Sequence, residues 1–320
     1  MKNTLFFLAV IMLMISCKKE DGVKQKVAAV PVKEVKIQRF DKLFFESGPE
    51  ALPGLKQRFP YFFPAGNSDQ VWIARMNEPF LKELYTEVQK KYPDVKGVEA
   101  SLQDLFQHIK FYYPEAKQPG VVTLVSDDNE IKSIYTDSLV IIPLSLYLGK
   151  DNRLYEGLPK YVAQNFEPSQ ILPDVAASFA EGKIRFPRDR TLLAQMIYYG
   201  KQLYMKDLLL PDVPDADKIG YTKEQAAWCV ANETDMWRYF IDEKLLYETD
   251  PKLASRFINP APFSKFYREI DNESPGRVGQ WIGWQIVRSY AENNPKATLQ
   301  KILALDEKQL FDNSKYKPKK

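Results

Sequence analysis

Residues 120–142 (GVVTLVSDDNEIKSIYTDSLVII) decide the fold, because they form the one part of the chain with a strong β-strand pattern. Apolar and β-branched residues gather in three runs, 121–125, 131–135 and 139–142. The polar stretch Ser126–Asn129 between the first two runs is typical of a turn. We predict a small antiparallel β meander over about 120–142.

The sequence on both sides of this region favours helices. Residues 70–92, interrupted at Pro79, and residues 98–112 have helical periodicity, whereas Val32–Phe40 alternates like a strand. The helices expected after the meander cover about 157–166, 169–182, 190–206, 223–247, 251–258, 278–293 and 297–304. The expected fold class is therefore α+β and predominantly helical. We assign residues 32–314 to a single globular domain and residues 315–320 to a basic tail.

The N-terminus has the features of a bacterial signal peptide over residues 1–16. Lys2 precedes the apolar run Leu5–Ile15, whose helical length of about 16 Å is too short to span a bilayer. Met14–Cys17 resembles a lipobox, which implies cleavage before Cys17 and lipidation of its thiol. Residues 17–31 would then form a tether. The alternative is an ordinary secretory peptide with an incidental cysteine.

Composition excludes several classes of protein. The chain has 45 Lys and Arg against 42 Asp and Glu, a net charge of +3, and no basic stretch interleaved with aromatics, so nucleic acid is not an expected partner. Two cysteines cannot form a disulfide framework, and one histidine cannot form a multi-histidine zinc site. We expect no metal and no cofactor. His108 is interpreted as a structural histidine and Cys229 as a buried apolar residue.

Acidic pairs leave a hydrolase open as an alternative, because two carboxylates can cleave a glycosidic bond without histidine. The candidate pairs are Glu233 with Asp235, Asp242 with Glu243, and Asp271 with Glu273. With 42 acidic residues in the chain, such pairs also arise by chance. Solvated helix faces and caps are the competing interpretation, and His108 is a further candidate base.

Two apolar segments, 196–210 and 275–287, carry residues for either packing or binding. Gly279 and Gly283 lie one helical turn apart, which predicts a close approach of another backbone. One interpretation is helix–helix packing in the core. The other is a groove for a partner or ligand, lined by Tyr199, Gly200, Tyr204, Trp281, Gly283 and Trp284.

Four motifs occur together in the order typical of one known family. They are SCKKED at 16–21, KIQRFD at 36–41, MIYYGKQLY at 196–204 and PGRVGQWIGWQIVRSY at 275–290. The chain thereby resembles the gliding motility lipoprotein GldB family of Bacteroidota over nearly its whole length. The resemblance implies an envelope protein needed for gliding, whose partners are other proteins of the gliding and type IX secretion machinery. The resemblance assigns no catalytic residues to this chain.

A more distant resemblance is to zincin-like metallopeptidases, in which an H-E-x-x-H helix binds Zn²⁺. The corresponding helix here is Pro173–Glu181, which has no histidine, and Tyr199 occupies the acidic position of the I-x-E-G segment of that scaffold. The resemblance implies a zincin-like scaffold without its metal. We therefore expect a non-catalytic protein, with an envelope hydrolase or a glycan- or peptide-binding lipoprotein as the alternative.

The residues after Cys17 indicate where an anchored chain would reside. Lys18 in the position after the anchor cysteine favours the outer membrane by analogy with other lipoproteins, and we expect its periplasmic face. Lys19–Asp21 resembles a surface-export signal, so the outer face stays open as an alternative.

Overall fold

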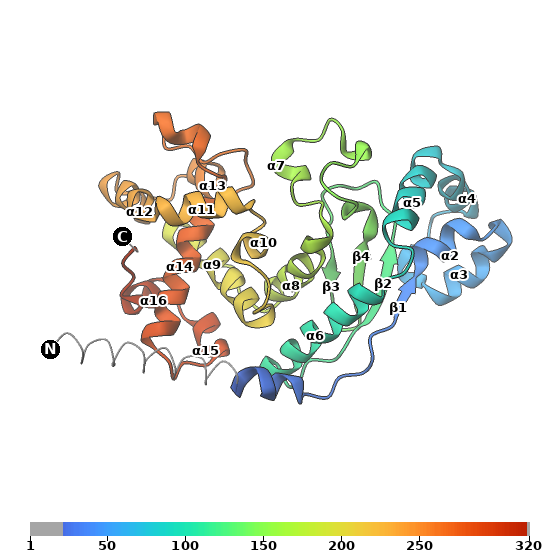
Figure 1. Cartoon of the computed structure of the whole chain (residues 1–320), viewed down its shortest axis with the longest axis horizontal. Coiled ribbons are helices and arrows are strands. Elements are labelled where there is room, and N and C mark those ends of the chain that lie inside the picture. Colours follow the sequence, from blue (N-terminus) through green and yellow to red (C-terminus); the bar gives the residue numbers. More distant parts are fainter. Residues whose placement is uncertain (1–21, 319–320) are drawn as a thin grey trace, which may run out of the picture.

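A computed structural model of the chain describes residues 22–318 (Figure 1). The predicted signal peptide over residues 1–16, the predicted lipidation site at Cys17 and the first residues of the expected tether lie outside the described residues. Residues 319 and 320 of the basic tail also lie outside them.

Helices dominate the described residues, which confirms the expected α+β, predominantly helical class. They are α2 (Phe40–Glu46), α3 (Leu52–Arg58), α4 (Asp69–Asn77), α5 (Pro79–Lys91), α6 (Lys96–Tyr112), α7 (Lys160–Ala163), α8 (Ile171–Glu181), α9 (Leu192–Leu209), α10 (Asp215–Ile219), α11 (Lys223–Ala231), α12 (Glu233–Asp242), α13 (Lys252–Phe257), α14 (Val278–Asn293), α15 (Leu299–Ala304) and α16 (Glu307–Ser314).

One four-stranded mixed sheet has the order β1-β2-β4-β3. Its strands are β1 (Ile37–Arg39), β2 (Gly120–Leu124), β3 (Ile134–Tyr135) and β4 (Leu139–Pro143). Strand β2 is parallel to both β1 and β4, and only β3 and β4 are antiparallel. The predicted antiparallel meander is therefore wrong for β2 and β4. The polar residues after β2 do not close a hairpin; they belong to a connection that returns the chain so that β4 runs alongside β2.

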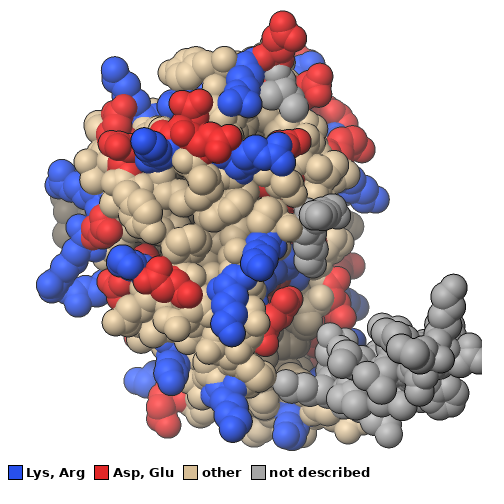
Figure 2. Space-filling model, turned by 90° about the vertical axis from the view of Figure 1, so that its left-hand side faces the viewer, with Lys and Arg blue, Asp and Glu red and all other residues tan. Residues whose placement is uncertain are grey.

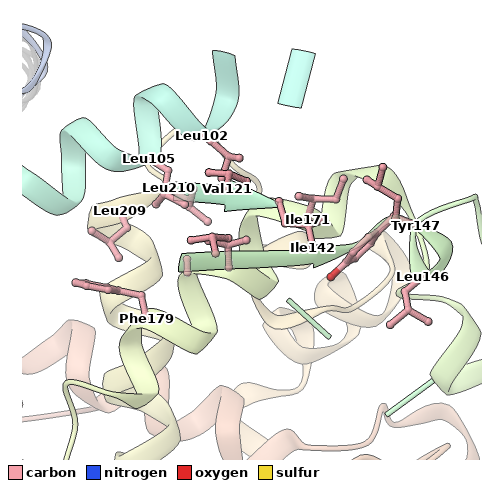
Figure 3. Close-up of a cluster of buried hydrophobic side chains, with 14 of the residues drawn as sticks. Leu102, Leu105, Val121, Ile142, Leu146, Tyr147, Ile171, Phe179, Leu209 and Leu210 are labelled. Carbon is pink, nitrogen blue, oxygen red and sulfur yellow. The ribbon is translucent and has the colours of Figure 1, made fainter. Parts of the chain in front are cut away.

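The two faces of the sheet contribute to different clusters of buried side chains. Val121 of β2 and Val140 and Ile142 of β4 pack with residues of α5, α6 and α8. Figure 3 shows Leu102 and Leu105 of α6 over Val121 in this cluster. Val122, on the opposite face of β2, packs with aromatic residues of α2 and the segment that follows it. The sheet is thus covered by helices on both faces.

A third cluster occupies the C-terminal helices, and it is centred on the crossing of α9 and α14. A Cβ atom built on Gly283 would lie 1.8 Å from the carbonyl oxygen of Met196, and one on Gly279 would lie 2.8 Å from that of Phe257. Both glycines thus make the close backbone approach that their spacing predicts. Tyr199 and Tyr204 of α9 pack against this cluster and against the sheet cluster.

Several helix boundaries differ from the sequence-based expectation. The single helix expected over 223–247 is divided into α11 and α12 at Asn232, whose side-chain Nδ2 donates to the carbonyl of Trp228 at 2.9 Å. Such a bond offers the backbone an alternative to continuing the helix. The start of α11 has the capping box of Thr222 and Gln225. The helix expected over 157–166 is reduced to α7.

The described ends of the chain contact the body. Residues 22–28, in the expected tether, are helical, and Val27 is buried. Lys24 forms an ion pair with Asp212 at 3.2 Å. In the expected basic tail, the Tyr316 hydroxyl donates to Glu233 at 2.9 Å. Within residues 22–318, no helix has both the length and the apolar character needed to cross a membrane.

Candidate functional site

A partly open, polar cavity of about 190 Å³ lies among α8, α9, α10 and the start of α14. Its lining is unusual in holding four cationic side chains and one carboxylate. These are Lys132, Lys206, Lys218, Arg277 and Asp174. Amide side chains complete the polar lining, namely Asn165, Gln170, Gln202 and Gln280. The cavity therefore combines positive charge with neutral donors and acceptors.

Helix geometry brings the α9 residues to this cavity. Tyr199, Leu203 and Lys206 are spaced four and then three residues apart, so they lie on one face of α9. Asp174 and Ala177 come from α8, and these two residues share a helix face for the same reason. The two segments that the zincin resemblance identified, 173–181 and Tyr199, thus border the same cavity.

Two of the four cations have acidic partners. Lys132 Nζ lies 3.2 Å from Asp174 Oδ1, and Asp174 also accepts a hydrogen bond from the Tyr147 hydroxyl at 3.0 Å. Lys218 Nζ lies 3.1 Å from Asp207 Oδ1. The positive charges of Lys132 and Lys218 are therefore compensated.

The other two cations, Lys206 and Arg277, donate to backbone carbonyls. Lys206 Nζ donates to the carbonyl of Lys218 at 2.7 Å, and Arg277 Nη2 donates to the carbonyl of Gly220 at 3.0 Å. No carboxylate in the described part of the chain forms an ion pair with either of them. The cavity therefore carries an excess of two positive charges at neutral pH.

Burial shifts the pKa values of three side chains that line this cavity. Desolvation lowers the pKa of Lys206 to about 8, with the nearby charges of Lys132 and Arg277 acting in the same direction and Asp174 against it. Desolvation also lowers the pKa of Arg277. Burial raises the pKa of the Tyr199 hydroxyl, so this group stays protonated. All three groups offer protons for hydrogen bonds at neutral pH.

This donor set fits an anion and opposes a metal cation. Zn²⁺ requires deprotonated ligands, and two uncompensated cations would repel it. Within residues 22–318, no group of three or more His, Cys, Asp or Glu side chains is arranged to hold a metal ion.

The structure places the tryptophans of the expected groove in the core. Trp281 is 3% exposed and Trp284 is fully buried. Trp284 Nε1 donates to Asp207 Oδ2 at 2.8 Å, and the Arg288 guanidinium lies 3.8 Å from its ring centre. Gly200 and Gly283 contact each other through their backbones. A groove lined by these tryptophans is therefore not formed, because their rings fill the space between helices.

The two tyrosines of the expected groove border different cavities. Tyr199 lines the cationic cavity. Tyr204 lines a separate, more open hollow of about 670 Å³, together with Glu233 and Arg288. The six residues therefore do not share one binding surface.

The acidic pairs do not converge on a common site. Glu233 is buried, whereas Asp235 is exposed and forms an ion pair with Arg238 at 3.0 Å. Asp242 and Glu243 are exposed. Asp271 accepts hydrogen bonds from the backbone N–H groups of residues 266 and 267, and Glu273 is exposed. Glu233 accepts the Tyr316 hydrogen bond, Asp271 accepts backbone hydrogen bonds in a turn, and the other four residues are exposed.

The remaining candidate nucleophile and base lie apart from the cavity lining. Cys229 is fully buried, and burial raises the pKa of its thiol. His108 is partly exposed on α6, and its Nδ1 lies 2.9 Å from the carbonyl oxygen of Asp104. These positions agree with the structural interpretation of both residues.

The surface formed by the C-terminal helices carries charges of both signs. Figure 2 shows Lys and Arg side chains interspersed with Asp and Glu over the displayed face. This face has no broad field of one sign of the kind that attracts nucleic acid.

Comparison with known proteins gives the family. The family model for the gliding motility protein GldB matches residues 20–318, which include every element described above. Searches of curated proteins and of solved structures returned no match. Because the family model spans nearly the whole chain, the protein belongs to the gliding motility protein GldB family.

Proposed function

We propose that this protein is a lipid-anchored, non-catalytic component of the gliding machinery in the cell envelope. The family match over residues 20–318 carries the motility assignment. The lipobox-like sequence ending at Cys17 supports an anchor, and Lys18 supports the outer membrane, on whose periplasmic face we place the protein. The proposed partners are other envelope proteins of the gliding and type IX secretion machinery.

The charge of the cavity supports a non-catalytic role. A metallopeptidase needs ligands that bind Zn²⁺, but the cavity bordered by α8 and α9 presents Lys206 and Arg277 without acidic partners. A hydrolase using paired carboxylates needs both at one site, and the acidic candidates lie in separate surroundings. The side chains that do meet in one cavity are mainly cationic and amide groups, which are suited to binding an anion.

Complementation of a gliding bacterium that lacks its own family member tests this proposal. The wild-type chain should restore single-cell gliding. The combined variant His108→Ala, Glu233→Gln and Glu243→Gln should restore it equally when its amount in the envelope matches that of the wild type. Loss of gliding by a folded, correctly located combined variant would favour the hydrolase alternative.

Secretion is scored in the same strains to test the partnership. If the protein acts with the type IX machinery, the deletion should reduce export of secreted proteins, and the wild-type chain should restore it. Normal secretion in a non-gliding deletion strain would contradict that partnership while leaving the motility role intact.

A further inference from the structure

We propose that the cationic cavity among α8, α9 and the start of α14 is a binding site for a doubly charged oxyanion of the phosphate class. Lys206 and Arg277 would be its principal ligands. This inference goes beyond the proposed function, which assigns no ligand to the protein.

The balance of charge is the first argument. Lys132 and Lys218 have carboxylate partners, whereas Lys206 and Arg277 donate to carbonyls and form no ion pair with a carboxylate in residues 22–318. The Arg277 guanidinium also lies 5.2 Å from the Tyr221 ring centre, a contact that leaves its charge without an anionic partner. A buried charge is costly unless it is paired. An anion with two negative charges would neutralise the excess, whereas a single carboxylate would leave one cation uncompensated.

The hydrogen-bond donors fit the same ligand. A guanidinium presents several N–H groups in a planar fork that matches phosphate oxygens, and an ammonium acts as a compact point charge. Gln202 and Gln280 add neutral amide groups to the lining. Gln280 Nε2 also donates to the carbonyl of Ile258 at 2.8 Å. Lys206 and Gln202 of α9 and Arg277, next to α14, thus bring donors from two elements to one cavity.

The size of the cavity suits a small anionic group. The cavity volume of about 190 Å³ is well above the roughly 10–15 Å³ that a single water requires. That space accommodates a phosphate group with a few attached atoms. Inorganic phosphate and the end of a phosphate monoester are therefore the two sources of this group that we propose.

The carbonyl contacts alone explain the two cations poorly. The Gly220 carbonyl, which Arg277 contacts, also accepts a hydrogen bond from Gln164 Nε2 at 3.2 Å. It would therefore keep a donor without Arg277. For Lys206, a single carbonyl contact does not require a full charge, and burial disfavours that charge.

Isothermal titration calorimetry with inorganic phosphate tests the site. The titrations use the full mature chain at pH 7 and constant ionic strength, with chloride and acetate as reference anions. The wild type should bind one phosphate per chain, and more tightly than either reference anion. Lys206→Met removes a charge-assisted hydrogen bond and should weaken phosphate binding about tenfold or more.

A second buried lysine on α9 provides the matched control. Lys201 pairs with Glu307 at 3.0 Å and does not line the cavity, so Lys201→Met should leave phosphate affinity unchanged. Lys206→Gln keeps a polar donor without charge and should also weaken binding. Circular dichroism confirms that each variant used is folded.

The outcomes are distinct. Absence of saturable phosphate binding to the wild type, equal binding of acetate, or unchanged affinity in both Lys206 variants would overturn the proposal. Competition by glycerol phosphate would identify a monoester end as the ligand class, and failure to compete would identify free phosphate. None of these results depends on whether the chain restores gliding.

Discussion

The backbones of Gly200 in α9 and Gly283 in α14 are in direct contact. A Cβ atom on Gly200 would lie 2.3 Å from the carbonyl carbon of Gly283, which is closer than real Cβ contacts. This contact lets the two longest helices of the C-terminal cluster cross without side chains between them. The rings of Trp281 and Trp284 pack edge to face, with their centroids 5.8 Å apart, as part of the core.

Gly283→Ala should destabilise the protein. The added methyl group would meet the backbone of Met196, which cannot move aside as a flexible side chain can. Overpacking of this kind costs about 2 kcal/mol or more, which exceeds the gain of about 1 kcal/mol in helix propensity. Urea unfolding followed by circular dichroism measures the difference.

Gly97→Ala is the control for this substitution. Gly97 lies in α6 with no atom within 4 Å of an added Cβ. Alanine there should be neutral or stabilising by about 0.4–1 kcal/mol. Equal stability of the Gly283→Ala and Gly97→Ala variants would contradict the close helix crossing.

Trp281→Ala and Trp284→Ala should each lower the free energy of unfolding by about 3–5 kcal/mol, because both rings are buried. Tyr247→Ala removes an aromatic side chain that is 57% exposed, and it should change stability by less than about 0.5 kcal/mol. Thermal unfolding compares the three variants. If either tryptophan variant were as stable as the wild type but inactive in gliding, the result would support the binding groove instead of the core.

Asp41→Asn should destabilise the N-terminal part of the sheet. Asp41 is fully buried, pairs with Arg39 at 2.6 Å and accepts a hydrogen bond from the Thr123 hydroxyl at 2.5 Å. Losing one partner of a buried ion pair costs about 3 kcal/mol. Asp235→Asn breaks an exposed ion pair and should cost less than about 1 kcal/mol. Chemical denaturation of both variants measures their free energies of unfolding and shows whether the buried ion pair contributes more than the exposed one.

The lowered pKa of Lys206 predicts a pH-dependent stability. The pKa is about 8 in the folded protein and 10.5 for an ordinary lysine, so the unfolded chain binds more protons between these values. The free energy of unfolding should therefore rise through this range, by up to about 3 kcal/mol, relative to its value below pH 8.

Lys206→Met isolates this contribution. The variant should be at least as stable as the wild type at pH 7, because it removes a buried charge that costs stability there. The difference between the two proteins should shrink as the pH rises from 8 towards 10. Parallel pH dependence of the two unfolding curves would show that Lys206 keeps its ordinary pKa.

The sequence predicted the helical class, the break at Pro79 and the glycine-mediated approach of α14, because helical period and glycine spacing are local signals. Strand direction was missed. The runs containing Val121–Val122 and Val140–Ile142 are almost continuously apolar, as is typical of parallel strands covered on both faces. These apolar runs indicate parallel pairing, whereas the polar turn residues between them suggest a hairpin that does not form.

The cationic cavity could not be recognised from spacing. Lys132, Lys206 and Arg277 are far apart in the sequence, and only the packing of α8, α9 and α14 brings them together. One local signal existed, because Lys206 lies seven residues after Tyr199 on a face of α9 that is otherwise largely apolar. A charged residue on an inward face indicates a buried site but does not reveal its partners.

Single-cell gliding of a deletion strain that carries either the wild-type chain or Cys17→Ala tests the central claim most directly. Both proteins are quantified by immunoblot, and mass spectrometry identifies the lipid on the mature N-terminus. We predict that the wild type restores gliding with an acylated Cys17 and that Cys17→Ala, present in equal amount, restores little or none. Full gliding with the Cys17→Ala chain, or no gliding with an acylated wild type, would contradict the account of a lipid-anchored motility protein.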